Sequence, residues 1–303
     1  MKTIGPRLCF LGYLLLNLVW PVECRAETLT VATYNVENYT LADRMAEGVY
    51  RKAYPKPESE KAALRSVLRG LNADVVALQE MGGEAYLQEL QRDLAHEGMN
   101  YPHAAVLDAA DNDRHIAVLS RRPFAAVGRH ADLKFNYLDG TETVKRGLLE
   151  VTVATEAGAL TIFVLHLKSR FTDRADDPQS AERREKEAIA ARDRVLKIFP
   201  EPAQARFIIL GDFNDSRTSR PVRALLERGK TKIAEWLPAA DGRGETWTYD
   251  FRREDSYSRV DHMLVSPGLL PAVRGRSARI YDAPETMQAG DHRPLVATLD
   301  LVK

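Results

Sequence analysis

The feature that most constrains this chain is the alternation of short apolar runs with amphipathic segments between residues 27 and 301. Runs rich in β-branched residues predict strands, and apolar residues spaced three or four apart predict helices. No internal repeat or low-complexity linker interrupts the series. Strands that return through both hairpins and helices are typical of mixed sheets. We therefore expect one α/β domain of the α+β type, spanning residues 27–303.

Three segments have helical spacing, at residues 59–71, 86–96 and 180–199. Strands are expected at residues 29–36, 74–78, 115–120, 147–154, 160–167, 206–210, 246–249, 259–265 and 294–301. Trp247 and Tyr249 alternate with threonines in one of these strands, so we expect them to pack within a sheet. Stacking of one of them on a base or sugar is the alternative.

The first 26 residues predict a secretory signal peptide. Lys2 and Arg7 precede an apolar run over residues 8–20, and residues 24–26 (Cys-Arg-Ala) place small residues before a cleavage point at Glu27. The run is shorter than the roughly 20 residues that span a bilayer, and an uncleaved anchor is the alternative. We expect export to the periplasm or the exterior, with no transmembrane segment in the mature chain.

Composition narrows the chemistry. Both cysteines, Cys9 and Cys24, lie in the predicted signal peptide, so the mature chain has neither a cysteine nucleophile nor a thiolate metal site. The whole chain has 43 basic and 43 acidic residues, and removal of residues 1–26 leaves 40 and 42. This balance gives no strong global attraction for nucleic acid. Nothing in the sequence implies a protein partner, and we expect a monomer.

Acidic, amide and imidazole residues recur just after the apolar runs, where loops on a rigid scaffold often carry functional groups. The six segments are residues 33–38 (TYNVEN), 78–80 (LQE), 164–169 (VLHLKS), 210–215 (LGDFND), 258–262 (SRVDH) and 290–294 (GDHRP). A lone Asp at a strand end is more often a turn former or a helix cap. The inference therefore rests on all six segments in this order.

In this order the segments resemble the endonuclease/exonuclease/phosphatase superfamily, which includes DNase I-like nucleases, apurinic endonucleases, sphingomyelinases and inositol-phosphate phosphatases. The resemblance runs from Asn35 to Pro294, and the GDFN and GDH segments are its most specific parts. It implies a four-layer, DNase I-like sandwich, in which two packed mixed β-sheets lie between outer helices. The active site would lie at one edge of the sandwich.

A phosphodiester resists attack because its own negative charge repels the nucleophile, so catalysis needs positive charge, an oriented water and help for the leaving oxygen. A metal held by oxygen ligands supplies the first of these. Glu80 is the best candidate ligand, supported by Glu37, Asn35 and Asp291. Ligation by oxygen favours Mg²⁺ or Mn²⁺, with Ca²⁺ as an alternative. Many relatives have Asp in place of Glu37, whose longer side chain could bind through a water.

Four further residues have roles in proton transfer or water positioning. Asp212 and Asn214 lie two apart, so an extended chain would point both to one face, where they could activate and orient a water. His292 can act as a base or, when protonated, as a phosphate clamp. Asp261 would orient His292. The sequence leaves open whether His292 or Asp212 accepts the water proton.

His166 resembles the second histidine of the DNase I-like branch, which binds phosphate or protonates the leaving oxygen. Arg114, Lys168 and Arg170 are candidates for phosphate contacts, against ordinary surface charge as the alternative. By strand alternation, His262 should face away from the site.

The resulting hypothesis is a secreted, metal-dependent phosphodiesterase that cleaves DNA or RNA. One alternative is a phosphatase or a phospholipase C-like or sphingomyelinase-like hydrolase of small or lipid phosphoesters, which the near-neutral charge favours. No exposed aromatic hairpin for a membrane is recognisable in the sequence. The other alternative is a catalytically inactive binding module.

Overall fold

A computed structural model describes Met1 and residues 27–138, 140–172 and 174–302. The predicted signal peptide, apart from Met1, lies outside the described residues. Among these residues, no helix combines the length and apolar character that crossing a bilayer requires.

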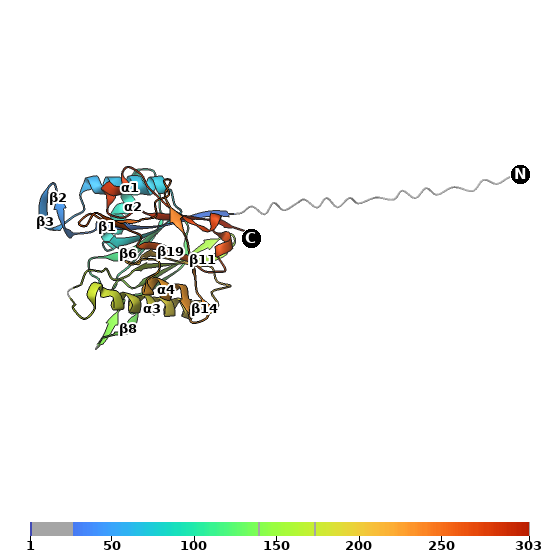
Figure 1. Cartoon of the computed structure of the whole chain (residues 1–303). Helices are drawn as coiled ribbons and strands as arrows, with labels where there is room; N and C mark the ends of the chain where they lie inside the picture. Colours follow the sequence, from blue (N-terminus) through green and yellow to red (C-terminus); the bar gives the residue numbers. More distant parts are fainter. Residues whose placement is uncertain (2–26, 139, 173, 303) are drawn as a thin grey trace.

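The described chain forms four layers (Figure 1), with two mixed β-sheets between two layers of helices. The seven-stranded sheet has the order β16-β20-β21-β1-β4-β6-β5. Its strands are β16 (Ala239–Ala240), β20 (Ala278–Ile280), β21 (Leu295–Leu301), β1 (Glu27–Tyr39), β4 (Val75–Met81), β6 (His115–Ser120) and β5 (His103–Leu107). The six-stranded sheet has the order β15-β19-β12-β11-β10-β7. Its strands are β15 (Glu235–Trp236), β19 (Asp261–Val265), β12 (Phe207–Asp212), β11 (Gly158–His166), β10 (Leu148–Thr155) and β7 (Phe124–His130).

Helices α1 (Glu58–Leu71) and α2 (Glu84–His96) cover the first sheet, and α3 (Ala181–Ile198) and α4 (Arg220–Leu226) cover the second. Shorter helices are η1 (Pro178–Ser180), η2 (Leu270–Ala272), η3 (Arg274–Arg276) and α5 (Thr286–Ala289). Four two-stranded ribbons complete the fold: β2 (Ala42–Ala46) with β3 (Val49–Tyr54), β8 (Lys134–Tyr137) with β9 (Gly140–Thr143), β13 (Glu227–Arg228) with β14 (Thr231–Lys232), and β17 (Tyr249–Phe251) with β18 (Ser256–Ser258). The predicted four-layer architecture is confirmed.

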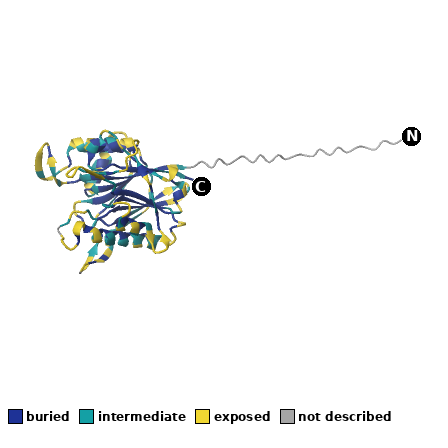
Figure 2. Ribbon diagram, in the orientation of Figure 1, coloured by how far each residue is buried: buried dark blue, intermediate teal, exposed yellow. Residues whose placement is uncertain are grey.

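Strand alternation divides the buried side chains into three main cores, and the sheets form the buried centre of the molecule (Figure 2). In β1, Leu29 and Val31 face the other sheet, while Ala32 and Tyr34 face α1 and α2. In β12 the inter-sheet positions are Ile208 and Leu210. Since successive side chains in a strand point to opposite faces, each central strand contributes to two cores at once.

The predicted elements are found within a few residues of their expected bounds, with one exception. The strand expected at residues 246–249 is wrong: the strand β17 begins only at Tyr249. The Thr248 side-chain oxygen accepts the backbone N–H groups of Val260 and Asp261, at 3.2 Å each. Trp247 instead lies under the Arg293 guanidinium, 3.4 Å from the ring centre.

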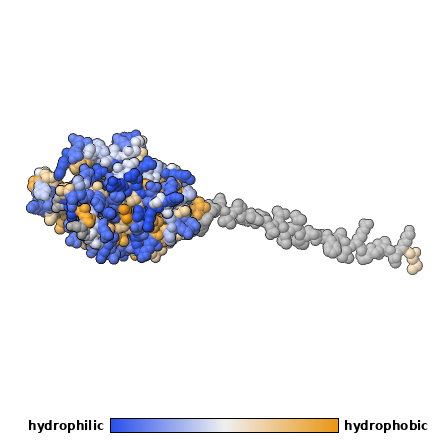
Figure 3. All heavy atoms as spheres, turned by 60° about the horizontal axis from the view of Figure 1, so that its bottom comes forward, coloured by the Kyte–Doolittle hydropathy of each residue, from blue (hydrophilic) through white to orange (hydrophobic). Residues whose placement is uncertain are grey.

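The sequence did not predict the hairpin β2–β3, which projects from one end of the sandwich (Figure 1). Its exposed side chains include Met45, Val49 and Tyr50. No such hairpin was recognisable in the sequence, and the structure shows one with an exposed aromatic residue, Tyr50. By contrast, the face that carries α3 and α4 is mostly hydrophilic, with small separate apolar patches (Figure 3).

Candidate active site

The candidate site is the polar end of the core between the two sheets. In β1, the inward positions Leu29 and Val31 are followed by Thr33 and Asn35, which are also buried. The inward face of β12 likewise ends at Asp212. Because β1 and β12 end at the same edge, these polar ends meet: the Asn35 Nδ2 donates a 3.0 Å hydrogen bond to Asp212 Oδ2, which joins the two sheets.

Two neighbouring strands bring further groups to this edge. His166 ends β11 and pairs in register with Asp212 of the parallel strand β12. Asp261 begins the antiparallel strand β19 and pairs with Asp212 from the other side. His262, the next residue, points to the opposite face, where its ring lies against Phe213. Strand alternation predicted this division between Asp261 and His262.

Asp212 is almost fully buried and is held by a tight turn. The backbone N–H of Asn214 donates to Asp212 Oδ1 at 2.8 Å, and Asn214 has a left-handed φ of 53°. The Asn214 Nδ2 lies 3.3 Å from Asp212 Oδ2 and donates to the Leu167 carbonyl at 3.0 Å. Burial, followed by the neighbouring Asp261, raises the pKa of Asp212 to about 7.

His292 lies on the loop before β21 and is oriented by Asp261. Its Nδ1 donates to Asp261 Oδ2 at 2.8 Å, and its Nε2 lies 3.9 Å from Asp212 Oδ2. Burial opposes the charged imidazolium, but the Asp261 carboxylate outweighs it and raises the pKa of His292 well above its ordinary value. The result is a carboxylate–imidazole pair of the kind that holds a proton at a defined position.

His166 has the opposite character. It is buried, and burial together with the Arg146 guanidinium lowers its pKa well below the ordinary value. Its Nε2 lies 3.5 Å from Asp212 Oδ2 and 3.9 Å from Glu80 Oε1. Within the described structure, its Nδ1 is buried and has no hydrogen-bond partner. The site thus holds one histidine that favours the charged form and one that favours the neutral form.

Carboxylates gather on the side of the site formed by the first sheet. Glu80 is the penultimate residue of β4 and has a left-handed conformation, with φ 61°, and its Oε2 accepts the Asn38 backbone N–H at 3.0 Å. Burial and the nearby Asp291 raise the pKa of Glu37 to about 7. Burial raises the pKa of Asp291, and repulsion from the Glu80 carboxylate raises it further. These three carboxylates therefore form an acidic region of the site, which Arg114 and His292 neutralise only in part.

Comparison with models of protein families identifies the family to which this chain belongs. The profile described as Endonuclease/Exonuclease/phosphatase family matches residues 32–292, which is most of the chain. The chain belongs to this family. A search of curated proteins found no match.

Solved structures of the same superfamily share its fold at low sequence identity. An endonuclease/exonuclease/phosphatase protein from Bacteroides vulgatus has a TM-score of 0.63 and 15% identity, covering 91% of this chain and 99% of the other. The human Nocturnin catalytic domain has a TM-score of 0.62 and 16% identity, with coverage of 90% and 96%. Sphingomyelinase C from Streptomyces griseocarneus has a TM-score of 0.59 and 17% identity, with coverage of 90% and 99%.

The residues of this family member can hold a divalent cation. Ligand atoms of Asp212, Asp261 and His292 lie within 4.8 Å of one another, the one such compact group of acidic, histidine or cysteine residues among those described. Glu37, Glu80 and Asp291, with Asn35, offer a looser set of oxygen donors beside it. The raised pKa values of Glu37, Asp212 and Asp291 mark crowded carboxylates, which a divalent cation would neutralise, so the donor set fits a metal.

The three cationic residues predicted to contact phosphate make different contacts in the structure. The Arg114 Nε donates to Asn38 Oδ1 at 2.7 Å and lies 3.9 Å from Glu80 Oε2, at the carboxylate side of the site. The Arg170 Nε reaches the Asn214 carbonyl at 3.4 Å. The Lys168 amino group is turned into its own loop, where it donates to the carbonyls of Ser169 and Phe171. Burial and neighbouring positive charge lower the pKa of Lys168 to about 8.

Sequence reasoning did not assign Tyr249 to this site. Its ring centre lies 4.8 Å from that of His292, and the two residues form a β-bridge. The alternation of aromatic and threonine residues over 246–249 was the available signal, and we interpreted it as sheet packing. Arg146 was also missed: it is buried, bonds Asp111 Oδ2 at 2.8 Å and contributes to the low pKa of His166.

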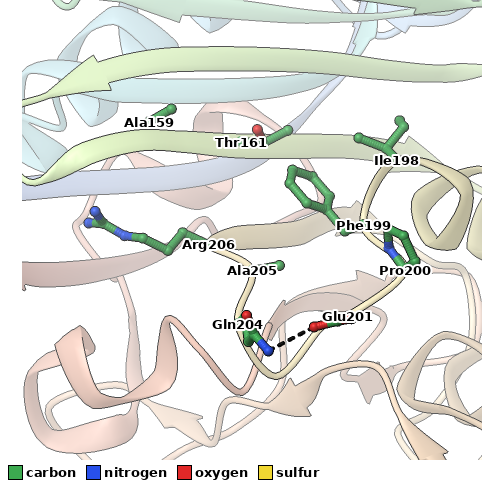
Figure 4. Close-up of a pocket in the computed structure, with 9 residues that line it drawn as sticks. All are labelled: Ala159, Thr161, Ile198, Phe199, Pro200, Glu201, Gln204, Ala205 and Arg206. Carbon is green, nitrogen blue, oxygen red and sulfur yellow. Dashed lines mark hydrogen bonds between the residues drawn. The ribbon is translucent and has the colours of Figure 1, made fainter.

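A separate hollow of about 460 Å³ lies at the other end of β11 and β12 (Figure 4). Thr161 lines it, five positions along β11 from His166, which corresponds to roughly 17 Å. Its Glu201 carboxylate accepts a hydrogen bond from Gln204 within the same loop. This hollow is therefore remote from the titratable groups of the candidate site.

Proposed function

We propose that this chain is an exported, metal-dependent phosphodiesterase with DNA or RNA as its substrate. The observation that carries the proposal is the group formed by Asp212, His292 and Asp261, with His166 against Asp212 on its other side. Membership of a phosphoesterase family supports the reaction class. The apolar N-terminal run supports export.

The roles follow from the chemistry of each group. Asp212 and His292 lie close enough to share the proton of an attacking water, and Asn214 holds the loop that would orient that water. Asp261 fixes the imidazole and stabilises its charged form. His166 Nε2 lies 3.5 Å from Asp212 Oδ2, and the lowered pKa of His166 favours its neutral form, so we assign it the role of a hydrogen-bond donor to a phosphate oxygen or to the leaving oxygen. A general acid or base of this kind contributes typically 10²–10⁴-fold to the rate.

Glu80, Glu37, Asn35 and Asp291 are the residues that we propose as ligands for Mg²⁺ or Mn²⁺. The ion would supply positive charge at the nonbridging phosphate oxygens. We assign the metal to these oxygen donors rather than to the compact group, because the hydrogen bond to Asp261 and the raised pKa of His292 favour an imidazolium, whose two ring nitrogens are both donors and cannot bind a metal. Arg114 lies beside Glu80 and is the described cation best placed to contact the same phosphate.

The test is nicking of supercoiled plasmid by the purified mature protein with Mg²⁺, beside an EDTA control and the His292→Ala variant. We expect nicking that both controls abolish. Intact plasmid in every lane, with release of phosphate from small monoesters, would replace the nuclease assignment with a phosphatase. Signal-peptide cleavage is checked separately by the mass of the exported protein, which should begin at Glu27.

A lipid phosphoester is the second candidate, because the β2–β3 hairpin exposes Met45, Val49 and Tyr50 at the end of β1 that carries the site. Such a hairpin could enter the interfacial region of a bilayer. The same protein is therefore tested on vesicles of sphingomyelin and phosphatidylcholine. Release of phosphocholine without plasmid nicking would favour this candidate, and Met45→Asp with Tyr50→Asp should then reduce the release.

A further inference from the structure

A cavity of about 520 Å³ opens beside the candidate site, between the β17–β18 ribbon and the loop that follows β11. Two of its lining residues also contact the catalytic groups: Asn214 bonds Asp212, and Tyr249 lies against His292. A substrate whose phosphate reaches Asp212 and His292 therefore has this cavity next to it. Its volume falls in the range of about 300–1,000 Å³ that is typical of small-ligand sites.

One face of the β17–β18 ribbon forms a wall of the cavity. The register pairs Tyr249 with Ser258 and Phe251 with Ser256, and all four residues line the cavity. The intervening pair, Asp250 and Tyr257, points to the other face and does not line it. Since cross-strand pairs share a face, this wall is an aromatic surface edged by two hydroxyl groups.

The aromatic rings of this wall are arranged in a row. The ring centres of Tyr249 and Phe251 are 6.0 Å apart with an interplanar angle of 24°, and Tyr249 continues the row to His292. The opposite wall carries Phe171, whose side chain is 85% exposed although it is large and apolar. The Phe171 carbonyl accepts a hydrogen bond from the Lys168 amino group, which holds this loop in place.

Polar groups complete the lining. Arg170, Arg253 and Glu254 lie around the cavity with the two serines, so hydrogen-bond donors and acceptors surround the aromatic surfaces. A flat ring with polar edges satisfies both features, because its faces stack on aromatic side chains while its edges bond the surrounding groups. An alkyl chain would leave the polar groups unpaired, and that costs free energy when they are buried.

We propose that this cavity is a subsite for a nucleobase. The base belongs to the nucleoside on one side of the scissile phosphate. The proposal rests on the proposed phosphodiesterase function and names the substrate class for it. Phe171 and Phe251 are the residues that stack on the base, and Tyr249 connects the stack to His292. The exposure of Phe171 is then explained, because the base covers it in the complex.

The test compares ligands that differ only in the nucleoside. Thymidine 3′-monophosphate and thymidine 5′-monophosphate, which cover both sides of the scissile phosphate, are measured beside methyl phosphate as inhibitors of bis(4-nitrophenyl) phosphate hydrolysis. We expect at least one thymidine ligand to inhibit more strongly than methyl phosphate. Phe171→Ala and Phe251→Ala should each reduce this advantage roughly 5- to 150-fold, the range found for loss of one stacking contact.

Controls separate stacking from folding. Phe171→Trp should keep the advantage of the thymidine ligand, and Tyr257→Ala, on the opposite face of the ribbon, should leave it unchanged. The inhibition constant of methyl phosphate should stay within about twofold in every variant. The subsite would be overturned if the variants weakened inhibition by methyl phosphate and by the thymidine ligands equally, or if the wild type showed no preference for a thymidine ligand. Hydrolysis of the diester would still uphold the phosphodiesterase function in either case.

Failure of the proposed function has a different signature. If neither bis(4-nitrophenyl) phosphate nor plasmid is cleaved, the phosphodiesterase assignment fails. The same ligands and variants are then compared by isothermal titration, where the loss of thymidine binding in Phe171→Ala still tests the cavity directly.

Discussion

At the scale of single residues, the two histidines of the site show how position sets function. His292 has a carboxylate on Nδ1, and its pKa is raised. His166 is equally buried but has positive charge near it, and its pKa is lowered. Both differences come from neighbours that are remote in the sequence. The sequence could indicate that His166 and His292 belong to one site, but it could not indicate their protonation.

His292→Ala should lower kcat by roughly 10²–10⁴-fold, because it removes the imidazole that shares a proton with Asp212. The fold should survive, since His292 lies on a loop before β21. His96→Ala, an exposed position on α2, is the matched control and should retain full activity. The measurement is kcat on a diester whose hydrolysis is established for the wild type. Near wild-type turnover in His292→Ala would remove the centre of the assigned site.

His262 supplies a prediction about acid stability. Trp236 Nε1 donates to its Nδ1 at 3.0 Å, and its Nε2 bonds the Asp215 carbonyl at 2.8 Å, so the neutral form fits this environment. Burial lowers the pKa of His262 to about 4, below the value of about 6.5 in an unfolded chain. The unfolded state therefore binds the proton first, and this contribution to stability is lost as the pH falls from about 6.5 towards 4.

Urea unfolding at pH 7 and pH 5 measures the effect. Between these values the His262 contribution to the free energy of unfolding should fall by about 2 kcal/mol. His262→Gln cannot titrate, and it should lose correspondingly less stability than the wild type over the same interval. Identical losses in both proteins would mean that another group causes the acid sensitivity.

At the scale of elements, the approach of β12 to β11 sets the spacing of Asp212 and His166. Gly211, which precedes Asp212, has a φ of 138°, and a Cβ added there would lie 1.9 Å from the Leu165 carbonyl oxygen. Gly211→Ala must therefore shift either strand. We expect a loss of roughly 2–4 kcal/mol in the free energy of unfolding. Gly242→Ala, where nothing lies within 4 Å of the added Cβ, should be near neutral in the same urea titration.

Eight strands of the two main sheets and the three longest helices could be predicted, because their apolar patterns extend over five or more residues. The β2–β3 hairpin could not, since most of its residues are solvent-exposed or half-buried and no apolar alternation marks it. Its turn is Glu47-Gly48, with φ values of 54° and 76°, which is a type I′ geometry. Glu-Gly is a weaker turn signal than Asn-Gly, so only the paired backbone makes the hairpin evident.

At the scale of the whole molecule, the site exists only where the two sheets pack together. Asn35, Glu80 and Asp291 come from the first sheet and its adjoining loops, while His166, Asp212 and Asp261 come from the second. The sequence placed each of them at a strand end, and family resemblance supplied the expectation that they meet. Which of the predicted cations lies at the carboxylates depends on loop conformation: the Lys168 amino group bonds the Phe171 carbonyl, while Arg114 lies beside Glu80.

The proposed metal site would couple metal binding to folding. An ion held by Glu37, Glu80 and Asp291 binds only the folded chain, where these carboxylates repel one another without it. At a Mg²⁺ concentration about 100 times its dissociation constant, the folded state gains about 2.7 kcal/mol. For a domain of this size we therefore expect the melting temperature to rise by roughly 5–10 °C, as measured by differential scanning fluorimetry with and without Mg²⁺.

Glu80→Gln tests where that ion lies, independently of activity. It should remove most of the Mg²⁺-dependent rise, and its metal-free melting temperature should equal or exceed that of the wild type, because one of the repelling charges is gone. Glu84→Gln, exposed on α2, should keep the full rise. If Asp261→Asn removed the rise while Glu80→Gln kept it, the ion would belong to the compact group of Asp212, Asp261 and His292, and His292 would be a ligand rather than a proton carrier.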